Sequence, residues 1–444
     1  MTPMSLFRPS PESTSLVVLH EAIMDSVSSV RDSIPEQHRA HFEALRQEII
    51  DFAKAHNIPR ESLAKPDALR EAAEHLSTQD LEQLANLLER FEYLLKNGEP
   101  KKEDYTEALE YAEEFYHLRE QYTSQVSLLE QVGILKEGAI TGIDGNIYPI
   151  PTLEQIAQRL FERREELSTK HDQGFIKLLL VPFGMSLDSL QETLKQFLFS
   201  YKRNNPSFAL DINRPLWAWE DYQGADIGDS PKLVYDPQSF TKDSHGGKTK
   251  IQILKEQSEG RWTLPPTAGS ATGGTAFAGV AEVGGTGTPG WTIHLLQPSN
   301  LDTQDTETPK GIAPIPREGE GTPHPSHRDG RDCPPLKTGQ SADDYLSILQ
   351  KAKEDEYSPY HLESGLTPED WIMAFMIHLT ETGELMDNFA NGTESTSYLT
   401  GVFFPSSTFV SCAYWDRGFR QASLDRYDPR DRDENIGARF SVMV

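Results

Sequence analysis

The chain has little cysteine, few basic residues and no long apolar run. Its two cysteines, Cys333 and Cys412, are too few for a disulfide framework, and no bridge between them is predicted. Lys and Arg number 42 against 69 Asp and Glu, a net charge of −27. This excludes a general nucleic-acid binder, because such a protein needs a basic surface. No segment approaches the roughly 18 consecutive apolar residues of a membrane span, so none is predicted.

The first residues, MTPMSLFRPSPEST, lack the charged-then-apolar pattern of a secretory signal. We therefore expect a cytoplasmic protein, and export by a different route stays open. At 444 residues the chain should form two or three domains.

Helical periodicity dominates residues 1–135. Apolar residues recur every three or four positions, which predicts amphipathic helices. Ser77 with Asp80 marks one helix start, and a single long helix is predicted over Tyr105–Val132. The stripes that carry this prediction are Leu16 to Val30, Phe42 to Phe52, and Leu81 to Leu95. We expect a helical bundle or hairpin that supports self-association or docking.

Residues 136–174 are predicted to form a hairpin and a connecting helix, because Asp144-Gly145 separates two short β-type runs. A further domain is predicted over 175–444. Its expected elements are strands at 176–182, 216–219, 291–296 and 398–404, and helices beginning after Ser186, Ser341 and Thr367. The fold class expected for the chain is therefore α+β.

Two stretches of the second domain are rich in Gly or Pro and lack periodicity. We predict flexible insertions at 267–290 and 299–340. The second contains His324, His327 and Cys333, but their spacing matches no zinc pattern, so a surface loop is favoured over a metal site. Lys242 stands where a phosphate loop ending at Gly247-Lys248-Thr249 would need glycine, so no nucleotide site is predicted. No cofactor is expected.

Residues 411–444 combine spaced apolar residues with Asp, Arg, Tyr, Ser and Gly in no burial period. Only Ala438–Val444 alternates as a strand should. The tail is either a solvated, salt-bridged loop or a recognition face, and Tyr, Trp and Arg together favour recognition. His378 lies on the apolar face of the helix after Thr367 and is predicted to be a core or rim histidine.

The tail resembles the variable region of the target proteins of diversity-generating retroelements. The supporting segments are LTPEDWIMAFMIHLTETGELMDNF, SYLTGVFFPSS, GWTIHLLQP, GGKTKIQILKEQ and PLWAWEDYQGAD. The resemblance covers roughly Phe175 to Val444. It implies a C-type-lectin-like domain related to the formylglycine-generating enzyme. It also implies randomised Asn codons that become Asp, Arg, Tyr, Ser or Gly, whereas Trp415, Gln421 and Glu434 cannot arise that way.

On this resemblance, residues 411–440 form a non-catalytic face for a variable macromolecular ligand. The side chains expected to point outward are Tyr414, Asp416, Arg417, Arg420, Ser423, Asp425, Arg426, Tyr427, Asp428, Arg430, Arg432, Asp433 and Asn435. Spaced residues such as Trp415, Phe419 and Leu424 should form the framework.

Two other functions stay open: an oxidase of the formylglycine-generating type, and a fixed protein-interaction module. The oxidase lacks support because Arg417 occupies the position where a second cysteine would pair with Cys412. No Ser/His/Asp set has a recognisable spacing, and the motifs of calcium-dependent lectins are missing. We therefore expect no enzyme activity.

Overall fold

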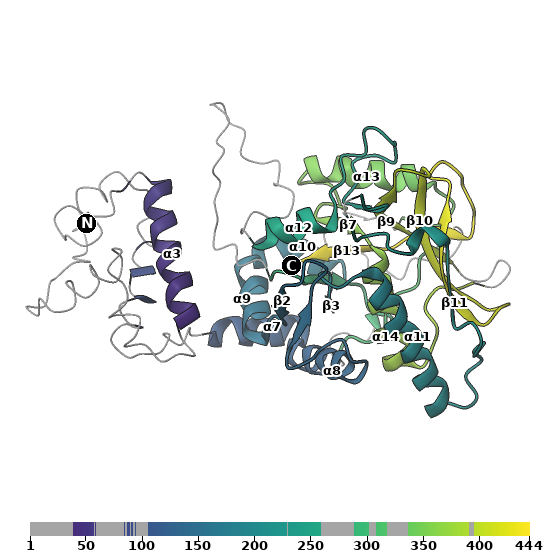
Figure 1. Cartoon of the computed structure of the whole chain (residues 1–444), viewed down its shortest axis with the longest axis horizontal. Helices are drawn as coiled ribbons and strands as arrows, with labels where there is room; N and C mark the ends of the chain where they lie inside the picture. The colour runs from purple at the N-terminus through teal and green to yellow at the C-terminus, as the bar shows by residue number, and fades with distance from the viewer. Residues whose placement is uncertain are drawn as a thin grey trace, which may run out of the picture. The chain divides into compact units, whose positions relative to one another are not determined.

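The structure is a computed structural model (Figure 1). It describes residues 39–56, 58, parts of 84–94, 105–228, 230–258, 288–301, 308–317, 336–389 and 395–444. The chain divides into two compact units, Met1–Asp104 and Tyr105–Val444. The expected boundary at residue 135 therefore differs from the observed one, because the helices that follow Tyr105 contribute to the core of the second unit.

The first unit contains helix α3, Arg39–Ala55, as its periodicity predicts. Phe42, Leu45 and Ile49 are buried, and the Phe42 ring stacks on Phe91 with centroids 5.3 Å apart. The predicted helices over residues 16–30 and the helix start at Ser77 lie outside the described residues.

The single helix predicted over Tyr105–Val132 is wrong. The chain forms α7, Thr106–Tyr116, and α8, Leu118–Gln131, separated by His117 in the left-handed conformation with φ 49°. His117 ends α7. Near this end Tyr116 is buried and Phe115 is 38% exposed. The predicted connecting helix is likewise two helices, α9, Leu153–Glu162, and α10, Arg164–Asp172. The predicted hairpin is confirmed as β1, Ala139–Thr141, and β2, Ile147–Pro149.

Two sheets form the frame of the second unit: a larger mixed sheet and a smaller antiparallel one. The larger has the described order β12–β9–β10–β11–β4, with β5 pairing β9 and β8 pairing β10. Its strands are β4 Leu216–Ala218, β5 Val234–Tyr235, β8 Asn388–Phe389, β9 Thr396–Phe404, β10 Phe409–Asp416, β11 Gln421–Tyr427 and β12 Ile436–Ala438. The smaller has the order β3–β6–β13–β7, from β3 Lys177–Val181, β6 Thr292–Leu296, β7 Glu363–Gly365 and β13 Phe440–Met443. The α+β class is thus observed.

Helix α14, Pro368–Thr382, is buried on all sides over its first three turns. Thr367 caps it, with Asp370 completing a capping box. It contacts α11, Leu187–Asn204, and strands of both sheets (Figure 1). The sequence predicted one apolar face on this helix, but the helix is surrounded by protein on every side, so its buried surface is wider than that face. No helix among the described residues is both long and apolar enough to cross a membrane.

Parts of the predicted flexible stretch 299–340 are well packed, so that prediction is wrong for residues 308–317 and 336–340. Ile312 and Ile315 are 3% and 4% exposed, and Thr338 is buried with them. Isolated Ile and Leu side chains between prolines anchor this extended backbone, and a test for periodicity misses such anchors. Residues 267–287, with most of the predicted Gly-rich insertion, lie outside the described residues.

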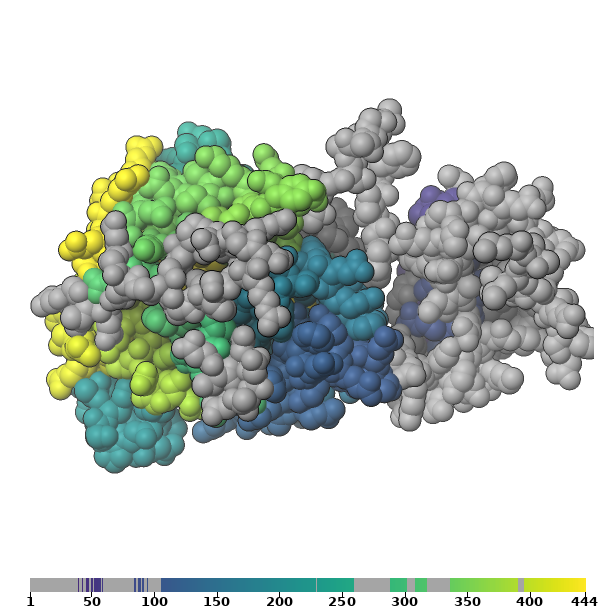
Figure 2. Space-filling view, turned by 180° about the vertical axis from the view of Figure 1, so that it is seen from behind, coloured from purple at the N-terminus to yellow at the C-terminus, as the bar shows by residue number. Residues whose placement is uncertain are grey.

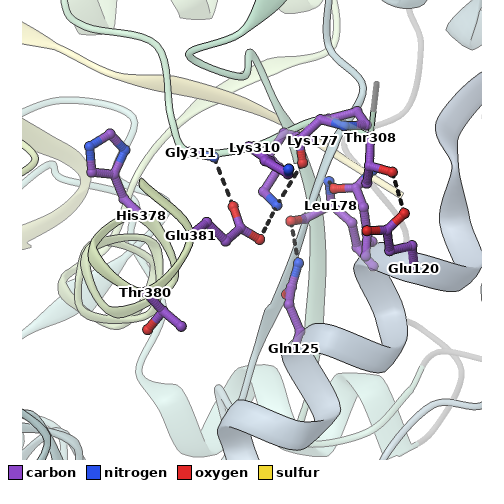
Figure 3. Close-up of polar contacts among 12 residues, drawn as sticks. Glu120, Gln125, Lys177, Leu178, Thr308, Lys310, Gly311, His378, Thr380 and Glu381 are labelled. Carbon is purple, nitrogen blue, oxygen red and sulfur yellow. Dashed lines mark hydrogen bonds and ion pairs between the residues drawn. The ribbon is translucent and has the colours of Figure 1, made fainter. Parts of the chain in front are cut away.

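A buried ion pair attaches one of these anchored segments to the core (Figure 3). Lys177 Nζ on β3 lies 2.6 Å from Glu381 Oε1 at the end of α14, and the Gly311 amide donates to Glu381 Oε2 at 2.8 Å. His378 lies one turn before Glu381. Its Nδ1 accepts the Ile312 amide at 2.9 Å, which confirms the prediction of a satisfied core histidine.

Two further helices of the described residues belong to the second unit. They are α12, Lys250–Ser258, and α13, Ala342–Glu354, the latter capped by Ser341 as predicted. The last predicted strand, 438–444, is interrupted at Arg439, where the chain passes from β12 in the larger sheet to β13 in the smaller. Arg439 is buried and pairs with Asp387 at 2.7 Å, and Trp371 Nε1 also donates to Asp387.

Candidate recognition face

The predicted outward-facing residues lie on a hairpin that the sequence did not reveal and on the loop that follows it. Strands β10 and β11 pair antiparallel, with Tyr414 opposite Ser423 and Trp415 opposite Ala422. Alternate residues face opposite sides of a strand, so Trp415 and Leu424 share the inner side. Trp415 stacks on Phe375 of α14 with centroids 6.0 Å apart, which fixes the hairpin to the central helix.

Two tyrosine–aspartate pairs involve the side of the hairpin opposite Trp415, one within the hairpin and one between the hairpin and the following loop. The Tyr414 hydroxyl donates to Asp425 at 3.4 Å, and the Tyr427 hydroxyl donates to Asp433 at 3.4 Å. The Tyr414 ring also packs edge-to-face on Phe389 at 5.7 Å. Burial raises the pKa of Tyr414 and that of Asp425. Burial also raises the pKa of Tyr427, so both tyrosine hydroxyls are neutral and can donate.

Residues 428–435 form a loop that local hydrogen bonds keep in one conformation. Asp428 accepts the Arg430 amide at 3.0 Å and Asp433 accepts the Asn435 amide at 2.8 Å. Such Asx turns restrict the backbone without core packing. Arg432 lies 2.8 Å from Asp344 at the start of α13, which attaches the loop to that helix.

Most of the predicted outward-facing side chains retain solvent exposure, and the C-terminal residues reach the surface along one edge of the second unit (Figure 2). The exposed ones are Arg417, Arg420, Asp428, Arg430 and Arg432. The half-buried ones are Tyr414, Asp416, Asp425, Arg426, Tyr427, Asp433 and Asn435.

Two assignments within the tail are wrong. Ser423 is 1% exposed, because its small side chain lies beside the larger Tyr414 ring of the paired strand. Phe419, expected in the framework, is 68% exposed. It stands in the turn between β10 and β11, where Asp416 Oδ1 accepts the amides of Gly418 and Phe419 and no core is within reach of the ring.

The thiol that an oxidase would need is inside the protein. Cys412 is a free cysteine and only 2% exposed. Burial raises the pKa of its thiol well above the ordinary value, so the reactive thiolate is disfavoured. Cys412 is part of the core cluster between the larger sheet and α13. Cys333, His324 and His327 lie outside the described residues.

The structure also brings together a serine, a histidine and an aspartate that sequence spacing could not connect. His294 Nδ1 lies 3.0 Å from Ser441 Oγ, and His294 Nε2 lies 3.4 Å from Asp370 Oδ1. Ser441 is fully buried, so its hydroxyl cannot reach a substrate carbonyl as a triad serine must. No group of three His, Cys, Asp or Glu side chains within the described part of the chain is arranged to hold a metal ion.

Comparison of the chain with family models, curated proteins and solved structures finds no match. The function has to be inferred from the residues and their geometry.

Proposed function

We propose that residues 411–440 form a ligand-recognition face on a C-type-lectin-like domain, and that a retroelement diversifies its side chains. The observation that supports this is the separation of roles along the hairpin. Trp415, Ala422 and Leu424 are buried against the core, whereas twelve of the thirteen named side chains are exposed or half-buried. Exchanging such surface side chains changes stability little.

The chemistry of the face suits a macromolecular ligand. Tyr414 and Tyr427 offer rigid aromatic surface with a hydroxyl at its end, the combination enriched at protein-binding surfaces. Arg417, Arg420 and Arg430 add exposed cations to the same segment, and Asp428 adds an exposed anion. A mixed-charge rim of this kind contributes to partner choice and association rate more than to affinity. The helical first unit would serve self-association or docking.

Sequencing codons 411–444 across a population of the source organism tests the diversification. We expect substitutions to concentrate at the named positions, with Trp415, Ala422 and Leu424 constant, beside an Asn-rich template and a reverse transcriptase gene. A constant tail without a template would contradict diversification and favour a fixed interaction module.

Selection from two display libraries tests recognition separately. One library varies Arg417, Asp428 and Arg430, and the matched control varies residues 192, 195 and 196 on α11, which lie on the surface of another element. Binders to unrelated target proteins should emerge from the first library far more often than from the second. Equal yields would contradict a dedicated face.

A further inference from the structure

A second site lies away from the hairpin, in a cavity of about 340 Å³. Its walls come from α12, α13, α14, β5, β6, β7, β9 and β13, and Figure 1 shows α12, α13, β7 and β13 as neighbours in the second unit. The cavity is about twice the ~150 Å³ that suffices for benzene, and it falls in the range of small-molecule sites. The apolar part of its wall consists of Phe183, Pro237, Ile253, Leu346, Leu349, Leu362 and Met443.

Two polar atoms at the cavity wall have no hydrogen-bond partner among the described residues. They are Thr292 Oγ1 and Thr400 Oγ1, and each belongs to a side chain more than nine-tenths buried. Thr292 and His294 are two residues apart on β6, so both side chains face the same side of the sheet. Buried polar atoms are almost always paired, so two unpaired hydroxyls around one cavity indicate missing partners.

His294 adds no charge to the cavity wall. Burial lowers the pKa of His294, against the opposing effect of Asp370. Burial also raises the pKa of Asp370, against the opposing effect of His294. The imidazole is therefore neutral. Its Nδ1 faces Ser441 at 3.0 Å and its Nε2 faces Asp370 at 3.4 Å, so the two threonine hydroxyls are the groups left for a ligand.

The charged side chains around the cavity have partners within the protein. Lys353 pairs with Asp236 at 2.9 Å, and Lys248 pairs with Glu256 at 2.7 Å. Glu363 pairs with the buried Lys170 at 2.6 Å. Asp370 Oδ2 accepts the Thr367 amide at 2.8 Å. A charged ligand would have to compete with these pairs, whereas a neutral one would not.

We propose that this cavity binds a small neutral molecule with an apolar ring or short chain and one hydroxyl or carboxamide group. The apolar body would contact Leu349, Leu362 and Met443. The polar group would exchange hydrogen bonds with the hydroxyls of Thr292 and Thr400. None of the lining residues belongs to the recognition face, so the site is independent of the proposed function.

Titration of the full chain with phenol and with toluene tests the proposal, because the two probes differ mainly in the hydroxyl group. Thr292→Val and Thr400→Val remove one wall hydroxyl each with little change of shape. Each should lower the ratio of phenol affinity to toluene affinity by about fivefold, the value of one hydrogen bond. Thr380→Val, an exposed change on α14 outside the cavity, should leave the ratio unchanged.

Two further readouts separate binding from folding. Thr292→Val should keep or raise the melting temperature of the ligand-free protein, because it removes an unpaired buried hydroxyl. Ser364→Phe, which places a ring at the cavity wall, should abolish binding of both probes. The proposal is overturned if neither probe binds at millimolar concentration or if Ser364→Phe leaves binding intact. It is also overturned if both valine variants keep the wild-type ratio.

Discussion

Lys250 shows how a single residue links the parts of the second unit. It is fully buried, and its ammonium contacts Asp226 and, at 2.7 Å, Glu369. The Tyr235 hydroxyl also donates to Glu369 at 2.7 Å. Burial alone would lower the pKa of Lys250, but the two carboxylates outweigh burial and raise it. The lysine is therefore charged, and it joins α12, α14 and the loop at Asp226.

Replacing this lysine should be costly. Lys250→Met leaves Asp226 and Glu369 as uncompensated buried carboxylates, and we expect a loss of about 3–5 kcal/mol in the free energy of unfolding. Urea titration followed by tryptophan fluorescence measures it, since all six tryptophans lie after residue 105. The control Lys195→Met removes an exposed pair with Glu192 and should cost less than about 1 kcal/mol. Similar losses in both variants would contradict the assigned role.

His378 should make the second unit sensitive to mild acid. Burial, aided by Arg439, lowers the pKa of His378 from 6.5 to about 4. The unfolded chain then binds the proton more readily than the folded one, so stability falls as the pH drops from about 6.5 to about 4. Between pH 7 and pH 5 this residue should cost about 2 kcal/mol.

His378→Asn isolates this effect. The amide oxygen can still accept the Ile312 amide but does not titrate, so the variant should lose about 2 kcal/mol less than wild type between pH 7 and pH 5. Paired urea titrations at the two pH values give the difference. Parallel pH profiles for the two proteins would refute the assignment.

At the scale of single elements, the sequence predicted those helices and turns that short-range signals define, and it missed strands that depend on contacts between distant residues. The capped helices α13 and α14 and the hairpin β1–β2 could be predicted because their caps and turn residues act over three or four positions. Strands β10 and β11 could not. Ser411 and Gln421 are polar yet buried, so burial on both sides of the hairpin leaves no alternation to read. The cavity could not be predicted either, since Thr292, Thr400 and His294 meet only through the pairing of distant strands.

Replacing a buried residue of the hairpin should lower the free energy of unfolding, and replacing an exposed residue of the following loop should not. Trp415→Ala removes a buried ring that packs on Phe375 and Phe208, and we expect a loss of about 3–5 kcal/mol. Arg430→Ser changes a side chain that is 83% exposed and should shift stability by less than about 0.5 kcal/mol. Urea titration of both variants checks this. A large loss for Arg430→Ser would argue against a tolerant display face.

At the scale of the whole molecule, the cores of the two units share no residue. Phe42, Ile49 and Phe91 belong to a core cluster confined to the first unit. Tyr116, Leu129 and Leu160 belong to the main cluster of the second. Helical periodicity showed that residues 106–131 are helical but could not show which core they join. Amphipathic helices of either unit look alike in sequence.

A fragment of residues 105–444 should therefore fold without the first unit. Its core clusters are complete within the fragment, and the division of the chain falls between Asp104 and Tyr105. We expect the fluorescence-detected urea midpoint of the fragment to match that of the full chain, because the tryptophans report on this unit alone. A matched fragment starting at Gly133 removes α7 and α8, which bury Tyr116 and Leu129 in the main core, and should not fold cooperatively. If the longer fragment also loses its cooperative transition, residues 1–104 contribute directly to the stability of the second unit.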